Sequence, residues 1–140
     1  MICSFFGHAD APENIKNALK SHIVQMIEKN IFSFYTGNNG KFDFMVQSVL
    51  EDLSLQYPQI TYSIVLSHIG ERAISGNQNR TVFPDGLELV PPRFAISKRN
   101  EWLIQHSDIV LTYLKYHSSN CAKWVEKAKR KKLKVINIAE

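Results

Sequence analysis

Short uncharged runs alternate with amphipathic helical patterns along this chain, and the alternation limits the fold more than any other feature. Residues 2–6 form one such run, which is typical of a strand covered on both faces of a parallel sheet. Further runs predict strands at residues 31–35, 60–66, 109–114 and 135–138. Strands that alternate with helices favour right-handed crossovers. The sequence therefore predicts an α/β fold, a doubly wound parallel sheet of about five strands with helices on both faces.

The helical patterns have clear limits. Asp10, Pro12 and Glu13 favour the start of a first helix. Its predicted buried stripe recurs every four residues: Ile15, Leu19, Ile23 and Ile27. A second helix is predicted to begin at Phe42 and to end before Pro58, with an apolar stripe of Phe42, Met45, Val46, Val49, Leu50 and Leu53. Residues 93–105 and 119–131 are predicted as two later helices.

Residues 67–92 show neither the helical nor the strand periodicity of apolar residues. This polar stretch contains several glycines and prolines, together with Asn77, Gln78, Asn79 and Arg80. A loop this long inside a compact domain is usually a functional lid or a disordered excursion. We expect one domain over residues 1–140, because a second domain would not fit in a chain of this length.

Composition limits the compartment and the partners. Cys3 and Cys121 do not resemble a disulfide framework, which favours a reducing cytoplasm. No apolar run approaches the ~20 residues of a membrane span, so we expect a soluble chain without a membrane partner. The net charge is +4, and the excess gathers in Lys127, Lys129, Arg130, Lys131, Lys132 and Lys134. A solvated helix end explains this run, and nucleic-acid binding is the alternative.

A glycine-bounded turn, residues 36–43, links the second predicted strand to the second helix. Gly37 and Gly40 have no side chains, so a ligand can approach the backbone N–H groups of the turn. The start of the helix that follows carries partial positive charge. A P-loop would need glycine at Tyr35 and Ser or Thr at Phe42, and the dinucleotide fingerprint would need G-x-G after the first strand. The turn therefore favours an anion, most plausibly phosphate, without either signature.

Ligands of open parallel sheets bind outside the carboxyl ends of the strands. Small and polar residues follow the predicted strands at these ends, and an arginine with an asparagine lies on the helix before the fourth strand. Helix capping and surface solvation are the structural alternatives for several of them. The candidate ligand-binding residues are Gly7, His8, Gly37, Asn38, Asn39, Gly40, Asp43, Arg99, Asn100, Ser118, Ser119 and Asn120.

Histidines also follow three predicted strands, at His8, His68 and His117. Strands lie ~4.8 Å apart, so ends separated by other strands cannot share one metal ion. We therefore predict no metal site. If the first and fourth strands are neighbours, His8 and His117 flank a pocket. No cofactor is expected.

An ordered set of motifs resembles the SLOG superfamily, which includes bacterial DNA-processing proteins and the LOG cytokinin-activating enzymes. The motifs are Phe5-Phe6-Gly7-His8-x-Asp10, Tyr35-Thr36-Gly37-Asn38-Asn39-Gly40-x-Phe42-Asp43, Pro91-Pro92-Arg93-Phe94-Ala95-Ile96, Arg99-Asn100 and Ser107-Asp108-Ile109-Val110. They span nearly the whole chain, and the nearest match is with small single-domain bacterial members. The resemblance implies a Rossmann-like fold, often a homodimer, that binds nucleotides or nucleotide-derived ligands.

LOG enzymes hydrolyse the N-glycosidic bond of a nucleoside monophosphate and carry P-G-G-x-G-T-x-x-E after the fourth strand. The corresponding residues here, 117–125, replace the glycines, and Val125 stands at the glutamate position. Glu126 is adjacent but points elsewhere around the helix. Arg99 matches the family arginine. Without the glutamate, a carbocation-like transition state lacks its stabilising carboxylate.

Three hypotheses follow. The first is a nucleotide-binding module, with phosphate at residues 37–40 and 118–120, Arg99 as the cation, Asp43 toward the sugar, and the loop 67–92 closing over the ligand. The second is a nucleotide N-glycosidase, whose catalytic candidates are Asp43, Glu126 and Arg99. The third is a single-stranded nucleic-acid binder that uses the basic C-terminal helix and Trp124.

Overall fold

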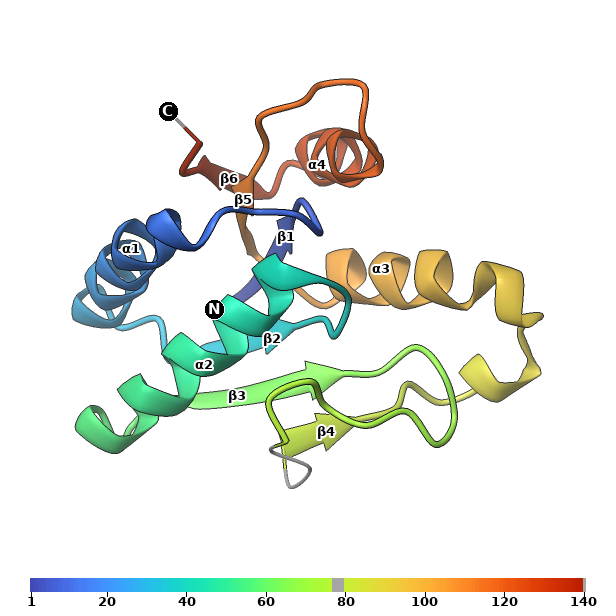
Figure 1. Ribbon diagram of the computed structural model, residues 1–140, viewed down its shortest axis with the longest axis horizontal. Coiled ribbons are helices and arrows are strands. Elements are labelled where there is room, and N and C mark those ends of the chain that lie inside the picture. Colours follow the sequence, from blue (N-terminus) through green and yellow to red (C-terminus); the bar gives the residue numbers. More distant parts are fainter. Residues whose placement is uncertain (77–79, 140) are drawn as a thin grey trace.

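The computed structural model describes residues 1–76 and 80–139, and these residues form an all-parallel sheet of six strands (Figure 1). The spatial order is β4-β3-β2-β1-β5-β6. The strands are β1 (Ile2–Gly7), β2 (Ser33–Thr36), β3 (Thr61–Val65), β4 (Thr81–Val82), β5 (Ile109–Tyr113) and β6 (Lys134–Asn137). The predicted α/β fold with a doubly wound parallel sheet is confirmed.

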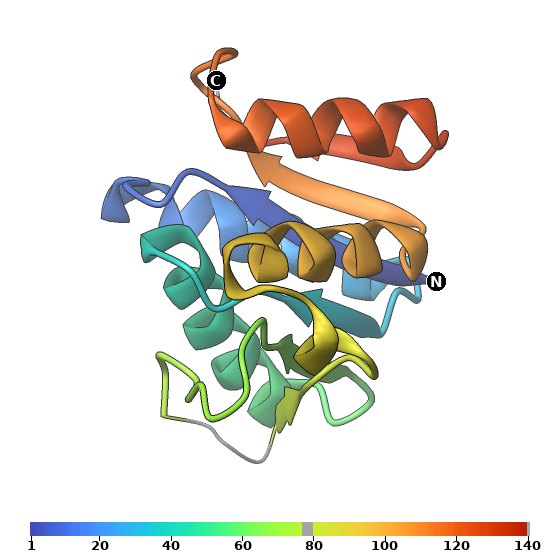
Figure 2. The same ribbon diagram turned by 90° about the vertical axis from the view of Figure 1, so that its right-hand side faces the viewer.

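Four α-helices cover the sheet in the described part of the chain: α1 (Lys16–Glu28), α2 (Lys41–Gln56), α3 (Ala95–Gln105) and α4 (Asn120–Arg130). Short 3-10 helices precede α1 at Glu13–Ile15 and α3 at Leu87–Leu89 and Pro92–Phe94. Helices α1 and α2 lie on one face, and α3 and α4 lie on the other (Figures 1 and 2). No helix among the described residues is both long and apolar enough to cross a membrane.

The strand order reverses at β1. The chain first builds outward from β1 through β2 to β3, then returns to add β5 on the other side of β1. Ser4 of β1 is therefore in register with Tyr35 of β2 and with Val110 of β5. Such a reversal leaves a crevice at the carboxyl ends of the two central strands, because the helices on either side of it cover opposite faces.

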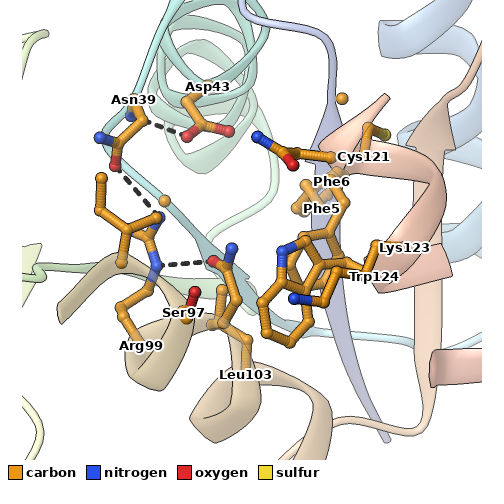
Figure 3. A pocket seen from close by; sticks show the side chains of 15 residues that line it. Phe5, Phe6, Asn39, Asp43, Ser97, Arg99, Leu103, Cys121, Lys123 and Trp124 are labelled. Atoms are coloured by element: carbon orange, nitrogen blue, oxygen red, sulfur yellow. Dashed lines mark hydrogen bonds between the residues drawn. The ribbon is translucent and has the colours of Figure 1, made fainter. Parts of the chain in front are cut away.

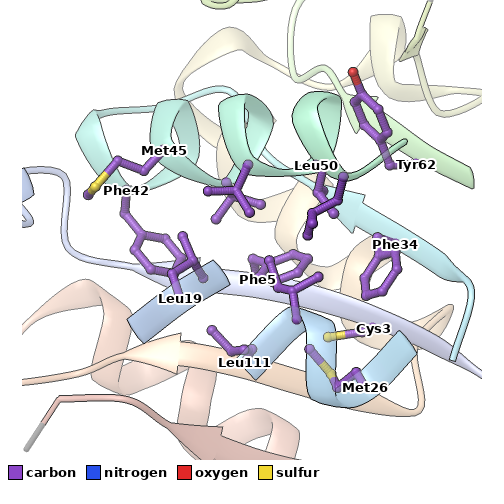
Figure 4. Packing of buried hydrophobic residues seen from close by; sticks show 14 of the residues in the cluster. Cys3, Phe5, Leu19, Met26, Phe34, Phe42, Met45, Leu50, Tyr62 and Leu111 are labelled. Carbon is purple, nitrogen blue, oxygen red and sulfur yellow. The ribbon is translucent and has the colours of Figure 1, made fainter. Parts of the chain in front are cut away.

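The larger apolar core lies between the sheet and helices α1 and α2 (Figure 4). Every residue of the predicted α2 stripe is buried, and so are Leu19, Ile23 and Ile27 of α1, whereas Ile15 is only partly buried. The ring of Phe42 packs against Gly7, where a Cβ atom would lie 2.3 Å from its Cγ. A second cluster joins α3 and α4 to the other face through Leu103, Val110 and Val125.

The strand count corrects the prediction of about five. The additional strand β4 lies inside the predicted loop 67–92 and pairs with β3 through Ile64–Thr81 and Val65–Val82. Its two residues carry no sequence period, so pairing with the exposed edge of β3 creates the strand. Arg80 precedes it, and the predicted loop residues Asn77, Gln78 and Asn79 lie outside the described residues.

Candidate functional site

A cleft of about 210 Å³ opens at the carboxyl ends of the central strands, where the strand order reverses. Its walls come from the end of β1, the turn after β2, the first turns of α2 and α4, and the inner side of α3. Binding sites for drug-sized ligands usually measure about 300–1,000 Å³. The cleft therefore suits a small polar ligand or the polar part of a larger one.

Two oppositely charged side chains form one side of this cleft (Figure 3). Asp43 in the first turn of α2 is 7% exposed, and Arg99 of α3 is 3% exposed. Asn39 joins them, because its backbone N–H donates to Asp43 Oδ2 at 2.8 Å and its side-chain Oδ1 accepts from Arg99 Nη2 at 3.0 Å. The glycine turn thus holds a carboxylate and a guanidinium against the same space.

Arg99 is held in place by the protein itself. It donates from Nη1 to the carbonyl of Val65 at 3.0 Å and from Nε to Asn100 Oδ1 at 2.9 Å, in addition to the bond with Asn39. Three guanidinium donors are therefore used, and the others have no hydrogen-bond acceptor among the described residues. Asp43 Oδ1 likewise has no partner there, although Asp43 lines the cleft.

Asp43 and Arg99 do not form a direct ion pair in the described part of the chain. They lie on either side of Gly37, where a Cβ atom would come 2.7 Å from Asp43 Oδ2 and 3.1 Å from Arg99 Nη1. Any larger residue would force one charged group away. Glycine at position 37 is therefore required by the close approach of the two side chains.

Burial raises the pKa of Asp43 from 3.8 to about 6, against the opposing effects of the Arg99 charge and the N–H of Asn39, while Glu71 adds to the rise. Burial also lowers the pKa of Arg99, and the carboxylates of Asp43 and Glu71 oppose that change. The two charges thus remain in the cleft at a cost in desolvation. Carboxyl groups that titrate near neutrality inside a cleft are typical of functional sites.

The other predicted glycines shape the walls. Gly7 lines the cleft and makes room for the Phe42 ring. Gly40 lies outside it and has a φ of 94°, with a Cβ position 2.6 Å from the Cα of Ala9. The N–H of Lys41 donates to the Ala9 carbonyl at 2.8 Å. Gly40 therefore lets the segment after β1 pack against the start of α2.

Asn38 points away from the cleft into a polar network. Its Nδ2 donates to Glu71 Oε2 at 2.7 Å, and its Oδ1 accepts from Gln47 Nε2 and from the N–H of Ile74. Burial would raise the pKa of Glu71, but hydrogen bonds from Asn38, Ser67 and His68 outweigh it and leave the pKa lowered. Asn38 is thus saturated by protein partners and holds the turn in shape.

This network involves the loop 67–92, which is predicted to close over a ligand. None of the described residues of the loop 67–92 lines the cleft. The first part of the loop is fixed against the glycine turn instead, since Glu71 bonds to Asn38 and the N–H of Ser75 donates to Gln47 Oε1 at 3.1 Å. The sequence did not indicate Glu71 or Gln47, because the bonds from Asn38 to Glu71 and from Ser75 to Gln47 join residues 33 and 28 positions apart.

His8 has a structural role. It is 6% exposed, and its Nε2 accepts from the N–H groups of Lys115 and Tyr116 at 2.9 and 3.1 Å, which ties the loop after β5 to the end of β1. Burial lowers the pKa of His8, partly offset by Asp10. His117 lies exposed in the same loop. The described residues contain no group of three or more side chains suited to a metal ion.

Some residues at the start of α4 cap the helix, and others line the cleft. Ser119 caps the helix, since its Oγ accepts from the N–H of Ala122 at 3.3 Å, and Ser118 is exposed outside the cleft. Asn120 does line the cleft, as do Lys123 and Trp124, which the sequence analysis did not propose there. Lys123 follows Asn120 by three residues, so helical spacing would have placed both on one face.

The cleft therefore gathers seven of the twelve candidate ligand-binding residues: Gly7, Gly37, Asn39, Asp43, Arg99, Asn100 and Asn120. His8, Asn38, Gly40, Ser118 and Ser119 do not line it. Glu126, a catalytic candidate, is exposed on α4 and also lies outside. Asp43 is thus the one carboxylate among the described residues of the cleft lining.

No protein-family model matches the chain, and no curated protein matches it. Membership of the SLOG superfamily and the homodimer therefore stay predictions from the motifs.

Proposed function

We propose that this protein binds a nucleotide or a nucleotide derivative in the cleft at the carboxyl ends of β1 and β5. The observation that carries the proposal is the buried pair of Asp43 and Arg99, which line the cleft and keep hydrogen-bonding capacity without a partner among the described residues. A folded chain gains nothing in stability from such groups. A polar ligand that pairs with them accounts for their burial.

The position of the cleft supports the same proposal. It lies at the switch point of a doubly wound parallel sheet, which is where such sheets bind ligands. Phe6, Leu103 and Trp124 also belong to the lining, so apolar atoms lie beside its polar groups. A nucleotide combines both kinds of surface in one molecule.

The test is native mass spectrometry of the purified protein, followed by calorimetric titration with the common nucleoside 5′-monophosphates. We expect at least one of them to bind, and Gly37→Ala to weaken that binding, because the added Cβ displaces Asp43 or Arg99. At a concentration of 100 times Kd the ligand would stabilise the fold by about 2.7 kcal/mol. If no nucleotide copurifies, binds or raises Tm, the proposal is wrong.

A second candidate is hydrolysis of the N-glycosidic bond, which one observation favours. With a pKa of about 6, Asp43 is poised to take a proton from water near neutral pH. Water would add to the anomeric carbon and give one proton to Asp43 while the bond to the base breaks, and solvent would supply the proton that the departing base takes up. Chromatography would detect free base, and Asp43→Asn should lower the rate by about 100-fold or more. Binding without released base would exclude hydrolysis of that nucleotide.

We do not propose single-stranded nucleic-acid binding through Trp124. This ring is 6% exposed, and Lys123 Nζ and Lys127 Nζ lie 5.4 and 4.7 Å from its centroid. Stacking on a base needs an exposed ring face.

A further inference from the structure

The two sides of the cleft offer a ligand different partners (Figure 3). Asp43 and Arg99 face the cleft from α2 and α3, whereas Lys123 and Asn120 line it from α4. Both Lys123 and Asn120 are exposed residues, so the α4 side is the hydrated one. The α2–α3 side is the deep one, where the charged side chains are more than nine-tenths buried.

The deep side suits a hydroxyl group. Asp43 Oδ1 can only accept a hydrogen bond while ionised, and the spare N–H groups of Arg99 can only donate. A hydroxyl is the simple group that donates to one and accepts from the other. A phosphate would satisfy Arg99 but would place its own negative charge against Asp43, in a buried site where repulsion is strong.

The hydrated side suits the anion. Lys123 contributes an ammonium group there that has no ion-pair partner among the described residues. Asn120, at the first position of α4, adds a side-chain amide donor. Asp43, on the opposite wall, is the one carboxylate among the described lining residues, so a phosphate at Lys123 meets attraction there and repulsion only from across the cleft.

We propose that the cleft binds a phosphorylated sugar in one orientation, with a ribose hydroxyl between Asp43 and Arg99 and the phosphate at Lys123. This inference rests on the proposed nucleotide function only for the presence of a nucleobase in the ligand. The positions of the ribose hydroxyl and the phosphate are argued without the nucleobase. The proposed orientation also moves the phosphate away from the glycine turn and Arg99, and keeps it at the start of α4, the other place where the sequence predicted it.

The experiment measures Kd near pH 8 for four probes: AMP, 2′-deoxy-AMP, ribose 5-phosphate and 2-deoxyribose 5-phosphate. We expect the ribose form of each pair to bind about 10-fold or more tightly, since the deoxy form leaves buried polar atoms unpaired. Asp43→Asn should reduce this preference, whereas Asp52→Asn, an exposed change on the same helix, should leave it intact.

Lys123→Met tests the phosphate end. It should weaken AMP binding by about 10-fold and leave adenosine binding unchanged. Lys127→Met is the matched control, because Lys127 lies one turn further along α4 and lines a different groove. Circular dichroism and Tm would show that each variant is folded.

The outcomes separate this inference from the proposed function. Nucleotides that bind without a ribose preference would overturn the inference and leave the function standing. Tighter AMP binding by Asp43→Asn would overturn it as well, because it would place the phosphate beside Asp43. If the sugar phosphates follow the expected pattern and the nucleotides bind no better, the nucleotide function fails and the inference stands. Absence of binding by all four probes would refute both.

Discussion

The apolar core beneath α1 and α2 and the cleft at the carboxyl edge of the sheet meet in the first turn of α2. Phe42 points into the core, where it is fully buried against Gly7, while the next residue, Asp43, lines the cleft with one oxygen unpartnered among the described residues. Both are buried, but only Phe42 gains stability from burial. Two consecutive residues of one helical turn are thus retained for opposite reasons, Phe42 for stability and Asp43 at a cost to it.

The largest expected change in stability comes from a substitution in the apolar core. Phe42→Ala should lower the free energy of unfolding by about 3–5 kcal/mol, because it removes a fully buried ring and leaves a cavity beside Gly7. Urea denaturation measures the loss. Phe44→Ala is the matched control, since Phe44 is 44% exposed on the same turn and should cost less than about 1 kcal/mol. Equal losses of unfolding free energy in the two variants would contradict the conclusion that Phe42 stabilises the protein through its burial in the core.

On the cleft side, Asp43→Asn should stabilise the protein. The folded pKa of about 6 lies above the ordinary 3.8, so the ionised form disfavours folding above about pH 6. As pH falls from about 6 toward 3.8, protonation of Asp43 removes that cost and the wild type gains stability. The variant should therefore exceed the wild type by about 2–3 kcal/mol near pH 8 and match it near pH 4.

Urea denaturation of both proteins across this pH range checks the prediction, with Asp52→Asn as the exposed control. A variant that is less stable than the wild type at pH 8 would show instead that attraction to Arg99 outweighs the burial of Asp43.

Gly37 and Gly70 favour glycine for two different reasons, close approach of side chains at Gly37 and a positive φ at Gly70. Gly37→Ala should destabilise the fold by about 2 kcal/mol, because its Cβ would overlap Asp43 Oδ2 at 2.7 Å, and it should weaken ligand binding. Gly70→Ala should cost about 1 kcal/mol through its φ of 81° and leave binding unchanged, since no atom of the described residues lies within 4 Å of its Cβ position. Thermal denaturation with and without ligand distinguishes the two, and a binding defect in Gly70→Ala would refute this separation.

The smallest expected change in stability concerns His8, which binds the loop after β5. The pKa of His8 is lowered, so its contribution to stability is complete above the ordinary 6.5 and declines as pH falls below it. His8→Gln keeps an acceptor for Lys115 and Tyr116 but does not titrate. It should remove the part of the wild-type loss of stability between pH 7 and pH 5 that comes from protonation of His8. His117→Gln, an exposed change in the same loop, should retain that loss.

Much of the fold was predictable because it depends on local periodicity. The α2 stripe from Phe42 to Leu53 and the uncharged run of β1 repeat at helix or strand spacing, and both elements appear as predicted. Strand β4 was missed since two residues have no period, and only the free edge of β3 gives them a partner. The contact between the loop 67–92 and the glycine turn was not predicted for a similar reason, because the bond from Asn38 to Glu71 joins residues 33 positions apart.

The candidate site was predictable in part. Asp43 and the glycine turn follow a strand and open a helix, which is a pattern visible in the chain, and the structure lines the cleft with Gly37 and Asp43. Lys123 and Trp124 were not placed there, although helical spacing from Asn120 would have indicated Lys123. The role of His8 was not visible, since its acceptor nitrogen faces backbone N–H groups 107 and 108 residues away.

From the sequence alone, the alternation of strands and helices determines a parallel doubly wound sheet, because each element follows from residues that are close together in the chain. The tertiary structure decided which strand ends meet. It placed β5 beside β1, and so brought Arg99 of α3 and Lys123 of α4 to the cleft that the glycine turn also lines. The unpaired charges of the cleft exist only in that arrangement, since burial and long-range contact are properties of the folded chain.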